Sequence, residues 1–518
     1  MKRRHFIAGS ALPLLGCTNT EDIAGGFTGV NHQRGHMLRD SISGSTPLPL
    51  RKTSVLILGG GIAGLAAARA LHRKRIDDFA LLELEDTVGG NSRGGVLNGI
   101  DCPLGAHYLP LPGNDAPAVQ DLLEELGLRR RVAGRWQYDE RHLCHSPQER
   151  LFFNGAWQDG LLPLQDVGDT TLSQYRKMAE LVGQLRKRSR WTIPALGRPL
   201  DAVQLELATL TFAAFLDQQG LHDRHLRWYL DYCCRDDYGA GLASVSAWAG
   251  IHYFASRHGF SAPGHETQER EALLTWPEGN AWLVQRFAAP FKERLHSARV
   301  VLRIANAKHG VEVDAFNATT QTLERWQAQR AIVALPLLVA ARVTQNAPDF
   351  LRQAAGQIRY APWLVANIHL SSALIDRPGA APSWDNVLYG TPGLGYVDAM
   401  HQSLQSASGA TVLTYYRALG DWPDGRRLLL NRSWEAWRDE ILAELSLAHP
   451  DLAHKTSRID ITRYGHAMAI PAPRRANLHS VPARSDGRLS FAHGDWSGYS
   501  IFEETFTLGH RAASQGWA

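Results

Sequence analysis

The chain has 518 residues, of which 44% are hydrophobic and 20% are charged, a balance typical of a globular protein with a sizeable core. This length predicts two domains or one large discontinuous domain. The formal net charge is only +4, so the sequence predicts no nucleic-acid partner.

The first 17 residues, MKRRHFIAGSALPLLGC, are predicted to be a signal peptide. Their basic start precedes an apolar run too short for a membrane-spanning helix, which needs about 20 residues. Arg3 and Arg4 resemble a twin-arginine export signal, and the ending Leu-Leu-Gly-Cys resembles a bacterial lipoprotein box. We therefore expect the twin-arginine export machinery to carry the protein across the bacterial inner membrane into the periplasm. Lipidated Cys17 would tether it to a membrane there; a plain signal peptide is the alternative.

Residues 18–52 mix Gly, Ser, Thr and Pro with little periodicity, and are predicted to be a flexible linker. The apolar run 55–58 then predicts a buried parallel strand. The remaining cysteines and the histidines show no zinc spacing, so no metal site is predicted. Cys233 and Cys234 are expected to be small buried residues on a helix, although a redox-active pair is an alternative.

The glycines at 59, 61 and 64 fit the pattern G-x-G-x-x-G and predict a dinucleotide-binding turn. The first allows a tight turn, the second lets the backbone approach a pyrophosphate, and the third lets the following helix pack on the strand. That helix would direct its free N–H groups at the phosphates. Glu83 ends the next apolar run, where a carboxylate can bind ribose hydroxyls. The pattern alone does not separate FAD from NAD.

Four further stretches resemble one family. They are LELEDTVGGNSRGG after the second strand, LGAHY at 104–108, RAIVALPL at 330–337 and LSFAHGDWSGYSIFEETFTLGHRAA near the C-terminus. In this order they resemble the flavin-containing amine oxidoreductase superfamily, which includes monoamine and polyamine oxidases, phytoene desaturases and protoporphyrinogen oxidase. The resemblance implies FAD as the cofactor and an α/β fold, with a discontinuous Rossmann-type FAD-binding domain and a mixed α+β substrate-binding domain.

The resemblance also implies which residues contact the cofactor. Glu83 would hold the adenosine ribose, Gly105 and Ala106 would lie against the isoalloxazine, and Asp495 would lie near the ribityl chain. The backbone around Thr505 would lie at the pyrimidine edge. The full set of expected FAD contacts is Gly59, Gly61, Ile62, Ala63, Gly64, Glu83, Leu84, Gly89, Gly90, Asn91, Ser92, Gly105, Ala106, His107, Asp495, Glu504 and Thr505.

The sequence departs from the family pattern at several positions. Asn91 stands where an arginine is usual, and His493 replaces a glycine. Amine-oxidising members usually carry a lysine near flavin N5, but the expected counterpart, QIRYAPWLVANIHLSS, has none, and no lysine occurs between Lys308 and Lys455. The departure favours desaturase- or isomerase-like chemistry on C–C bonds as an alternative to amine oxidation. A non-catalytic, FAD-stabilised binding or assembly protein is a further alternative.

The predicted domains alternate along the chain. Segments 53–114, 276–344 and 461–518 are expected to form the FAD-binding domain, and alternation within 296–316 predicts a β-hairpin there. The substrate domain is expected to comprise a mainly helical segment, 115–275, and strands and loops in 345–460.

Candidate catalytic residues lie near the C-terminus. Trp496 and Tyr499 are candidates for aromatic walls, as is Tyr464, while His466 could act as an acid or base. The acidic stretch 236–238 could attract a cationic substrate, but a solvated helix end is the favoured interpretation. The predicted function is an FAD-dependent oxidoreductase that dehydrogenates a small or lipid-like substrate by hydride transfer to flavin N5. Its electron acceptor is not identified by the sequence.

Overall fold

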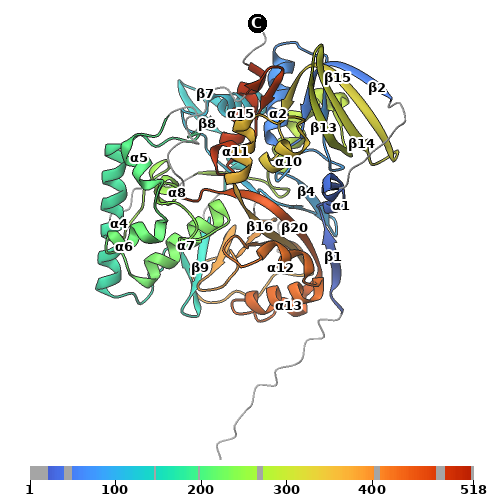
Figure 1. Ribbon diagram of the computed structural model, residues 1–518. Helices are drawn as coiled ribbons and strands as arrows, with labels where there is room; N and C mark the ends of the chain where they lie inside the picture. Colours follow the sequence, from blue (N-terminus) through green and yellow to red (C-terminus); the bar gives the residue numbers. More distant parts are fainter. Residues whose placement is uncertain are drawn as a thin grey trace, which may run out of the picture.

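The computed structural model describes residues 22–39, 49–144, 148–195, 199–264, 272–401, 409–473 and 485–514. Two large sheets organise these residues, one in the upper half of Figure 1 and one in the lower half. The predicted signal peptide, including Cys17, lies outside the described residues. Among the described residues, none of the helices has the length and apolar character needed to cross a membrane.

The first sheet is built around parallel strands. Its order is β12 (Leu295–His296), β3 (Phe79–Leu82), β2 (Leu50–Leu58), β15 (Thr322–Val333), β14 (Gly310–Asn317) and β13 (Arg299–Ala307), with β22 (Leu489–Phe491) beside β15. Strand β2 pairs in parallel with both β3 and β15, while β13 and β14 are antiparallel. The predicted strand at 55–58 and the predicted hairpin are therefore confirmed.

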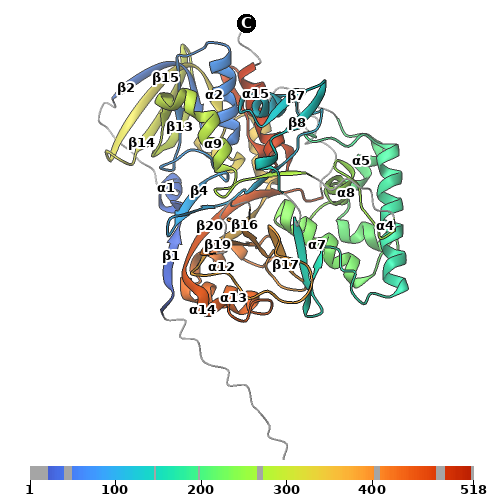
Figure 2. The same ribbon diagram turned by 180° about the vertical axis from the view of Figure 1, so that it is seen from behind.

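Two helices cross one another closely beside this sheet (Figures 1 and 2). Helix α2 (Ile62–Arg73) is buried from Ile62 to Leu71, and it packs on α15 (Phe502–Ser514). A side chain at Gly509 would reach within 1.9 Å of the Ala63 carbonyl oxygen, so only glycine permits this approach. The C-terminal helix thus covers the glycine-rich start of the fold.

The second large sheet lies in the lower half of Figure 1. Its order is β1 (Ala24–Thr28), β20 (Thr456–Ile470), β16 (Arg359–Leu370), β19 (Thr411–Ala418), β18 (Tyr396–Asp398), β17 (Asp385–Leu388), β9 (Glu149–Phe153) and β10 (Ala156–Asp159). Alternate residues of β16 face opposite ways, as strand geometry requires. Trp363 and Val365 join the apolar cluster that includes helices α4 (Asp169–Arg188), α7 (Arg224–Tyr238) and α8 (Ala247–Ala255). Leu364 and Ala366 face α12 (Gly425–Asn431) and α13 (Trp434–Leu445).

The other elements connect these layers. They are α1 (His32–His36), α3 (Pro117–Glu125), α5 (Ala202–Leu207), α6 (Phe212–Gln218), α9 (Ala281–Ala288), α10 (Leu337–Val343), α11 (Asp349–Gln357), α14 (Leu452–Lys455), β4 (Gly94–Leu97), β5 (Ile100–Pro103), β6 (Tyr108–Pro110), β7 (Arg129–Val132), β8 (Arg135–Tyr138), β11 (Leu273–Thr275), β21 (Ser485–Asp486) and the 3-10 helices η2 (Met37–Arg39), η3 (Glu140–His142), η4 (Ala289–Arg294) and η5 (Gly494–Ser497).

The structure corrects the predicted linker at 18–52. Its described parts are ordered: β1 pairs in parallel with β20, α1 and η2 follow, and β2 begins at Leu50. The linker interpretation was wrong for 22–39 because the partner of β1 is a strand more than 400 positions away, which local composition does not reveal. The predicted boundary at 461 also falls inside β20, since residues 461–470 continue the second sheet.

Cys233 and Cys234 lie buried on α7, as the helix interpretation predicted. Both are free thiols, and burial raises their pKa values. Burial disfavours the reactive thiolate.

Candidate functional site

The turn after β2 requires glycine at two positions for the fold itself. Gly59 has a φ of +103°, and a side chain there would lie 2.4 Å from the Ala334 carbonyl oxygen. A side chain at Gly64 would lie 1.9 Å from the Gly59 carbonyl oxygen. Gly64 therefore allows the start of α2 to pack directly against the turn.

Gly61 differs, because the space beside it is open. A side chain there would meet nothing closer than the Gly90 Cα atom, at 3.9 Å. Gly90 itself has a φ of +59°. A side chain at Gly90 would lie 3.2 Å from the Gly61 Cα atom, so the two bare backbones pack closely and leave the space beside them free of side chains, as expected where a backbone approaches a pyrophosphate.

The start of α2 supplies donors beside this space. Gly61 caps the helix without a side-chain hydrogen bond, and the Leu65 N–H donates to the Gly61 carbonyl. The N–H groups of Ile62, Ala63 and Gly64 precede that first intrahelical bond, and the first turn has no acidic residue. Such N–H groups and the positive end of the helix dipole favour a phosphate.

Glu83 lies directly beside the glycine turn. Its carboxylate accepts hydrogen bonds from the Gly60 N–H at 2.6 Å and from the Glu85 N–H at 2.8 Å. The side chain is 8% exposed, and burial raises its pKa despite these bonds. This arrangement fits the predicted role of holding a ribose, with Leu84 next along the chain.

A second loop carries the site from the glycine turn toward LGAHY. The Gly89 N–H donates to the Gly60 carbonyl, and the Ser92 N–H donates to the Gly89 carbonyl. The Asn91 carbonyl accepts the Ala106 N–H at 2.7 Å. A side chain at Gly105 would lie 2.3 Å from the Asn91 carbonyl oxygen. The structure thus brings the predicted residues at 59–64, 89–92 and 105–107 into one continuous surface.

An aromatic cluster, Trp363, Trp384, Tyr416 and Tyr464, surrounds the LGAHY turn. The Tyr464 hydroxyl donates to the Leu104 carbonyl at 2.8 Å, and the Tyr416 hydroxyl donates to the Gly105 carbonyl at 2.9 Å. Tyr464 also pairs directly with Trp363 across β20 and β16. Of the four, sequence reasoning singled out only Tyr464, because the others lie far from the family motifs along the chain.

His107 extends this aromatic cluster. Its ring stacks on Tyr416 with centroids 4.4 Å apart and lies 5.4 Å from Trp384. Burial lowers the pKa of His107 to about 4, so the imidazole is neutral at pH 7. The indole of Trp363 is 8% exposed, and its N–H has no hydrogen-bond partner among the described residues. A side chain at Gly239 would lie 2.7 Å from this nitrogen, so the indole packs closely against Gly239.

Two of the predicted catalytic aromatics, Trp496 and Tyr499, are not part of the aromatic cluster around the LGAHY turn. Trp496 packs against Phe350 and Phe491 in the core of the first sheet. Its prediction as an aromatic wall is therefore corrected, since the ring fills the core behind the cofactor-binding elements. Tyr499 is fully buried, and its hydroxyl donates to the Glu504 carboxylate at 2.7 Å. Tyr499 therefore packs in the apolar cluster that includes α7 and α8, with its hydroxyl bonded to protein.

The remaining C-terminal predictions meet around Asp495. Its carboxylate accepts the Leu337 N–H at 2.9 Å and the Tyr360 hydroxyl at 2.6 Å, and it lies 3.2 Å from His493. It therefore joins three segments of the fold, with Thr505 nearby against Gly494. The ring of His466 lies 5.4 Å from Tyr360, and burial lowers its pKa to about 4, which disfavours His466 as a proton acceptor at pH 7.

Three carboxylates, Glu149, Asp236 and Asp385, form an acidic cluster on β9, α7 and β17. Glu149 and Asp385 are register partners on the paired strands β9 and β17. Burial, with the neighbouring Asp237, raises the pKa of Asp236 to about 7. Burial also raises the pKa of Asp385, and Asp236 and Glu149 add to that shift. The solvated helix end favoured by the sequence is wrong for Asp237, which is buried and pairs with Arg257 at 3.1 Å. Asp236 is half-buried beside it.

This acidic cluster belongs to the same region as the aromatic cluster. Burial raises the pKa of the Tyr416 hydroxyl, and the negative charges of Asp236 and Asp385 raise it further. Those carboxylates are therefore close enough to act on a side chain that is bonded to Gly105. Among the described residues, no group of three or more His, Cys, Asp or Glu side chains has the arrangement of a metal site.

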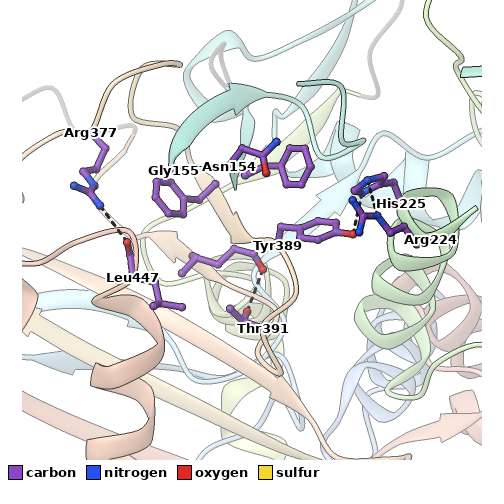
Figure 3. Close-up of a pocket in the computed structure, with 11 residues that line it drawn as sticks. Asn154, Gly155, Arg224, His225, Arg377, Tyr389, Thr391 and Leu447 are labelled. Carbon is purple, nitrogen blue, oxygen red and sulfur yellow. Dashed lines mark hydrogen bonds between the residues drawn. The ribbon is translucent and has the colours of Figure 1, made fainter. Parts of the chain in front are cut away.

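A separate cavity of about 540 Å³ is lined by other residues of β9, α7 and β17 and by neighbouring loops (Figure 3). It is lined by Phe152, Phe153, Asn154, Gly155, Arg224, His225, Arg377, Leu388, Tyr389, Thr391 and Leu447. Tyr389 and His225 hydrogen-bond within it at 2.9 Å. None of the predicted site residues lines this cavity, so it is not the predicted site.

Comparisons with known proteins agree with this geometry. The model of the family described as flavin containing amine oxidoreductase matches residues 62–515. The chain belongs to this family. It is 24% identical over 422 residues to probable polyamine oxidase 4 of Arabidopsis thaliana, covering 80% of this chain and 74% of that protein. It is 26% identical over 301 residues to polyamine oxidase 4 of Oryza sativa subsp. japonica, covering 57% of this chain and 54% of the rice protein.

Several solved structures share the fold of this chain. Putrescine oxidase bound to putrescine matches with a TM-score of 0.66 at 17% identity, covering 90% of this chain and 99% of that chain. Cyclohexylamine oxidase from Brevibacterium oxydans matches with a TM-score of 0.62, also at 17% identity, covering 90% and 98%. A fatty acid isomerase from P. acnes matches with a TM-score of 0.60 at 16% identity, covering 90% and 99%. The predicted fold class is confirmed.

Proposed function

We propose that the protein is an FAD-dependent oxidoreductase that dehydrogenates a small amine carrying a positive charge. The observation that carries this proposal is the meeting of the glycine cradle and the LGAHY turn with the aromatic and acidic clusters. Family membership supports flavin chemistry, and the polyamine oxidase relatives support an amine.

The glycine cradle fits FAD in detail. The side-chain-free surface beside Gly61 and Gly90 would receive the pyrophosphate, with the N–H groups of Ile62 and Ala63 directed at it. Glu83 would bind the ribose hydroxyls. When bound, FAD supplies a hydride acceptor at N5 of its ring. The side chains around LGAHY would position the substrate against that ring.

The acidic and aromatic clusters would select and orient the substrate. Asp236 and Asp385 would attract an ammonium group, and their burial makes that attraction stronger than it would be in water. Aromatic faces such as that of Tyr416 also favour cations. The neutral His107 and the Trp363 indole would exclude water beside the turn. A substrate with two amino groups would place one near the carboxylates and the other near the LGAHY turn.

Strand β16 carries no lysine, and this departure from the family pattern supports a second candidate reaction. Its face toward the helices carries Ala361, Trp363 and Val365, which belong to one apolar cluster. Dehydrogenation or isomerisation at a C–C bond is the alternative reaction on this fold. The half-buried carboxylates favour the amine, because their negative charges attract an ammonium group and do not attract an apolar lipid chain.

Anaerobic reduction of the bound flavin would test the proposal. Purified protein would be mixed with putrescine, spermidine, cyclohexylamine or an unsaturated fatty acid, while the flavin absorbance is followed. Bleaching by the amines and not by the fatty acid supports the proposal. Bleaching or isomerisation with the fatty acid alone favours the C–C alternative. Protein that binds no flavin contradicts both.

We also propose that the protein is exported and lipid-anchored at Cys17. The basic start and the Leu-Leu-Gly-Cys ending support this proposal. The described residues begin at residue 22, five positions after Cys17. Replacing Arg3 and Arg4 by lysine should keep the protein in the cytoplasm, and Cys17→Ala should release it from membranes. A membrane-bound Cys17→Ala protein would contradict the anchor.

A further inference from the structure

Residues 24–39 run from the second sheet to the cofactor side of the first. Strand β1 pairs with β20 over its whole length, and the guanidinium of Arg463 lies 3.6 Å from the Phe27 ring centroid. At the other end, the Leu38 carbonyl accepts a hydrogen bond from Arg342 at 2.6 Å. The segment is therefore held at both ends, with α1 between them (Figure 1).

Between these ends, the segment bonds to the turn that carries Glu83. The Asn31 N–H donates to the Glu85 carboxylate at 3.0 Å. The Arg34 guanidinium donates to the Leu84 carbonyl at 3.0 Å and to the Asp86 carboxylate at 2.8 Å. Arg34 is largely covered, with 17% of its side chain exposed.

Glu85 connects these contacts to Glu83 and, through Arg93, to Gly90. Its N–H donates to the Glu83 carboxylate at 2.8 Å. Its carboxylate lies 3.6 Å from the Arg93 guanidinium, which donates to the Gly90 carbonyl at 3.1 Å. One polar network therefore links Asn31 to the expected ribose carboxylate and to the glycine that faces Gly61.

The docking of α1 depends on polar contacts. None of its residues is buried, and a hollow of about 420 Å³ lies between residues 27–33 and 85–87. A helix without an apolar face gains little from burial. The position of this segment is therefore sensitive to single polar substitutions.

We propose that residues 24–39 act as a strap that holds the Glu83 turn in its cofactor-binding position and slows the release of FAD. Asn31 and Arg34 are its positioning residues. This inference rests on the proposed use of FAD and goes beyond it, because the family motifs begin only after the strap. Arg34 acts on the turn through Leu84 and Asp86, and Asn31 acts through Glu85, which lies beside Arg93.

The test compares Arg34→Ala, Arg34→Lys and the wild-type chain. We expect Arg34→Ala to release FAD about tenfold faster on dilution, a change equivalent to about 1.4 kcal/mol. In the wild type one Arg34 nitrogen, Nη1, donates to both Leu84 and Asp86. Arg34→Lys keeps the charge beside Asp86 but lacks the planar guanidinium that fixes this position, so its release rate should be intermediate. The matched control is Arg141→Ala, because Arg141 forms an exposed pair with Asp139 at 2.6 Å on a different part of the fold.

Melting temperatures separate positioning from general stability. For Arg34→Ala we expect a lower melting temperature with FAD bound and an unchanged one for the cofactor-free protein. An equal decrease in both, with an unchanged release rate, overturns the strap and leaves the proposed function intact. Wild-type protein that takes up no FAD overturns both proposals.

Discussion

The glycine turn and the aromatic and acidic clusters are two parts of one site, but they are built differently. The turn is made of backbone, from residues close together in the chain, and its geometry depends on the absence of side chains at Gly59, Gly61 and Gly64. The clusters are made of side chains from β9, β16, β17, β19, β20 and α7, which the second sheet and its covering helix bring together.

This difference separates binding the cofactor from choosing the substrate. A bare backbone turn binds a pyrophosphate in the same way whatever the second ligand is. Side chains of the clusters can change without disturbing that turn, because they lie on other elements. Substitutions in the turn should therefore remove the flavin, whereas substitutions in the clusters should change substrate preference while the flavin is retained.

The largest effect is expected from Gly61→Ala. The added methyl group meets no protein atom closer than 3.9 Å, so the protein should fold, but the methyl group would occupy the pyrophosphate cradle. We expect the flavin-to-protein ratio to fall at least about tenfold with little change in the far-ultraviolet circular dichroism. Gly113→Ala is the control, because nothing lies within 4 Å of its new side chain. Full flavin content in Gly61→Ala would show that the cradle is elsewhere.

The next effect is expected from Asp236→Asn. Removing one charge from the acidic cluster should raise the KM for a diamine about tenfold, since a charged hydrogen bond contributes roughly 1.5–3 kcal/mol. The KM for a monoamine bound only at the LGAHY turn should change less. Asp121→Asn, in an exposed pair with Arg73, is the matched control. An unchanged diamine KM would remove Asp236 from the substrate site.

The pH dependence of the diamine KM should follow Asp236. Burial places the pKa of this carboxyl at about 7, so it is neutral below pH 7 and negative above it. Attraction of an ammonium group therefore weakens as the pH falls through 7, and KM should rise several-fold between pH 8 and pH 6. Measuring KM across this range for wild type and Asp236→Asn checks the assignment, because the variant should lack this dependence.

A smaller effect is expected from Tyr416→Phe. Its hydroxyl fixes the Gly105 carbonyl, and its ring stacks on His107. Loss of this one hydrogen bond, about 1 kcal/mol, should lower kcat roughly threefold to tenfold while flavin content stays the same. Tyr389→Phe is the matched control, because the Tyr389 hydroxyl bonds to His225 in the separate cavity of Figure 3. Equal losses of kcat in the two variants would indicate a general effect on folding.

The smallest expected effect is a gain in stability for Asp236→Asn. In the folded wild-type protein the raised pKa makes ionisation of Asp236 costly, so stability falls as the pH rises from about 4 to about 7. The amide does not ionise, and the variant should melt a few degrees higher than wild type at pH 8 but not at pH 4. Calorimetry at the two pH values measures the difference. A variant that melts lower at pH 8 would show that the charged form of Asp236 is stabilised by partners in the fold.

The sequence was most informative where function depends on a short motif. Gly59, Gly61, Gly64 and Glu83 were predicted from spacing, and the structure places all four at one turn. LGAHY was predicted to lie against the flavin ring from its resemblance to the family, and the structure places it against Asn91. The C-terminal aromatics were less well predicted, because a motif fixes where Trp496 lies in the chain but not which way its ring points.

Long-range pairing explains what the sequence missed. Strand β1 has no local signal because its partner is β20, and the acidic cluster draws on β9, α7 and β17. The carboxylate of Asp236 resembles a solvated helix end until the second sheet places Asp385 opposite it.

The sequence by itself determined the cofactor turn, its helix and the family, because those depend on neighbouring residues and on glycine where a side chain would collide. Only the tertiary structure decided which aromatics and carboxylates face LGAHY and how residues 24–39 bind the Glu83 turn. Those contacts join side chains that are distant along the chain, and their positions depend on the folding of both sheets.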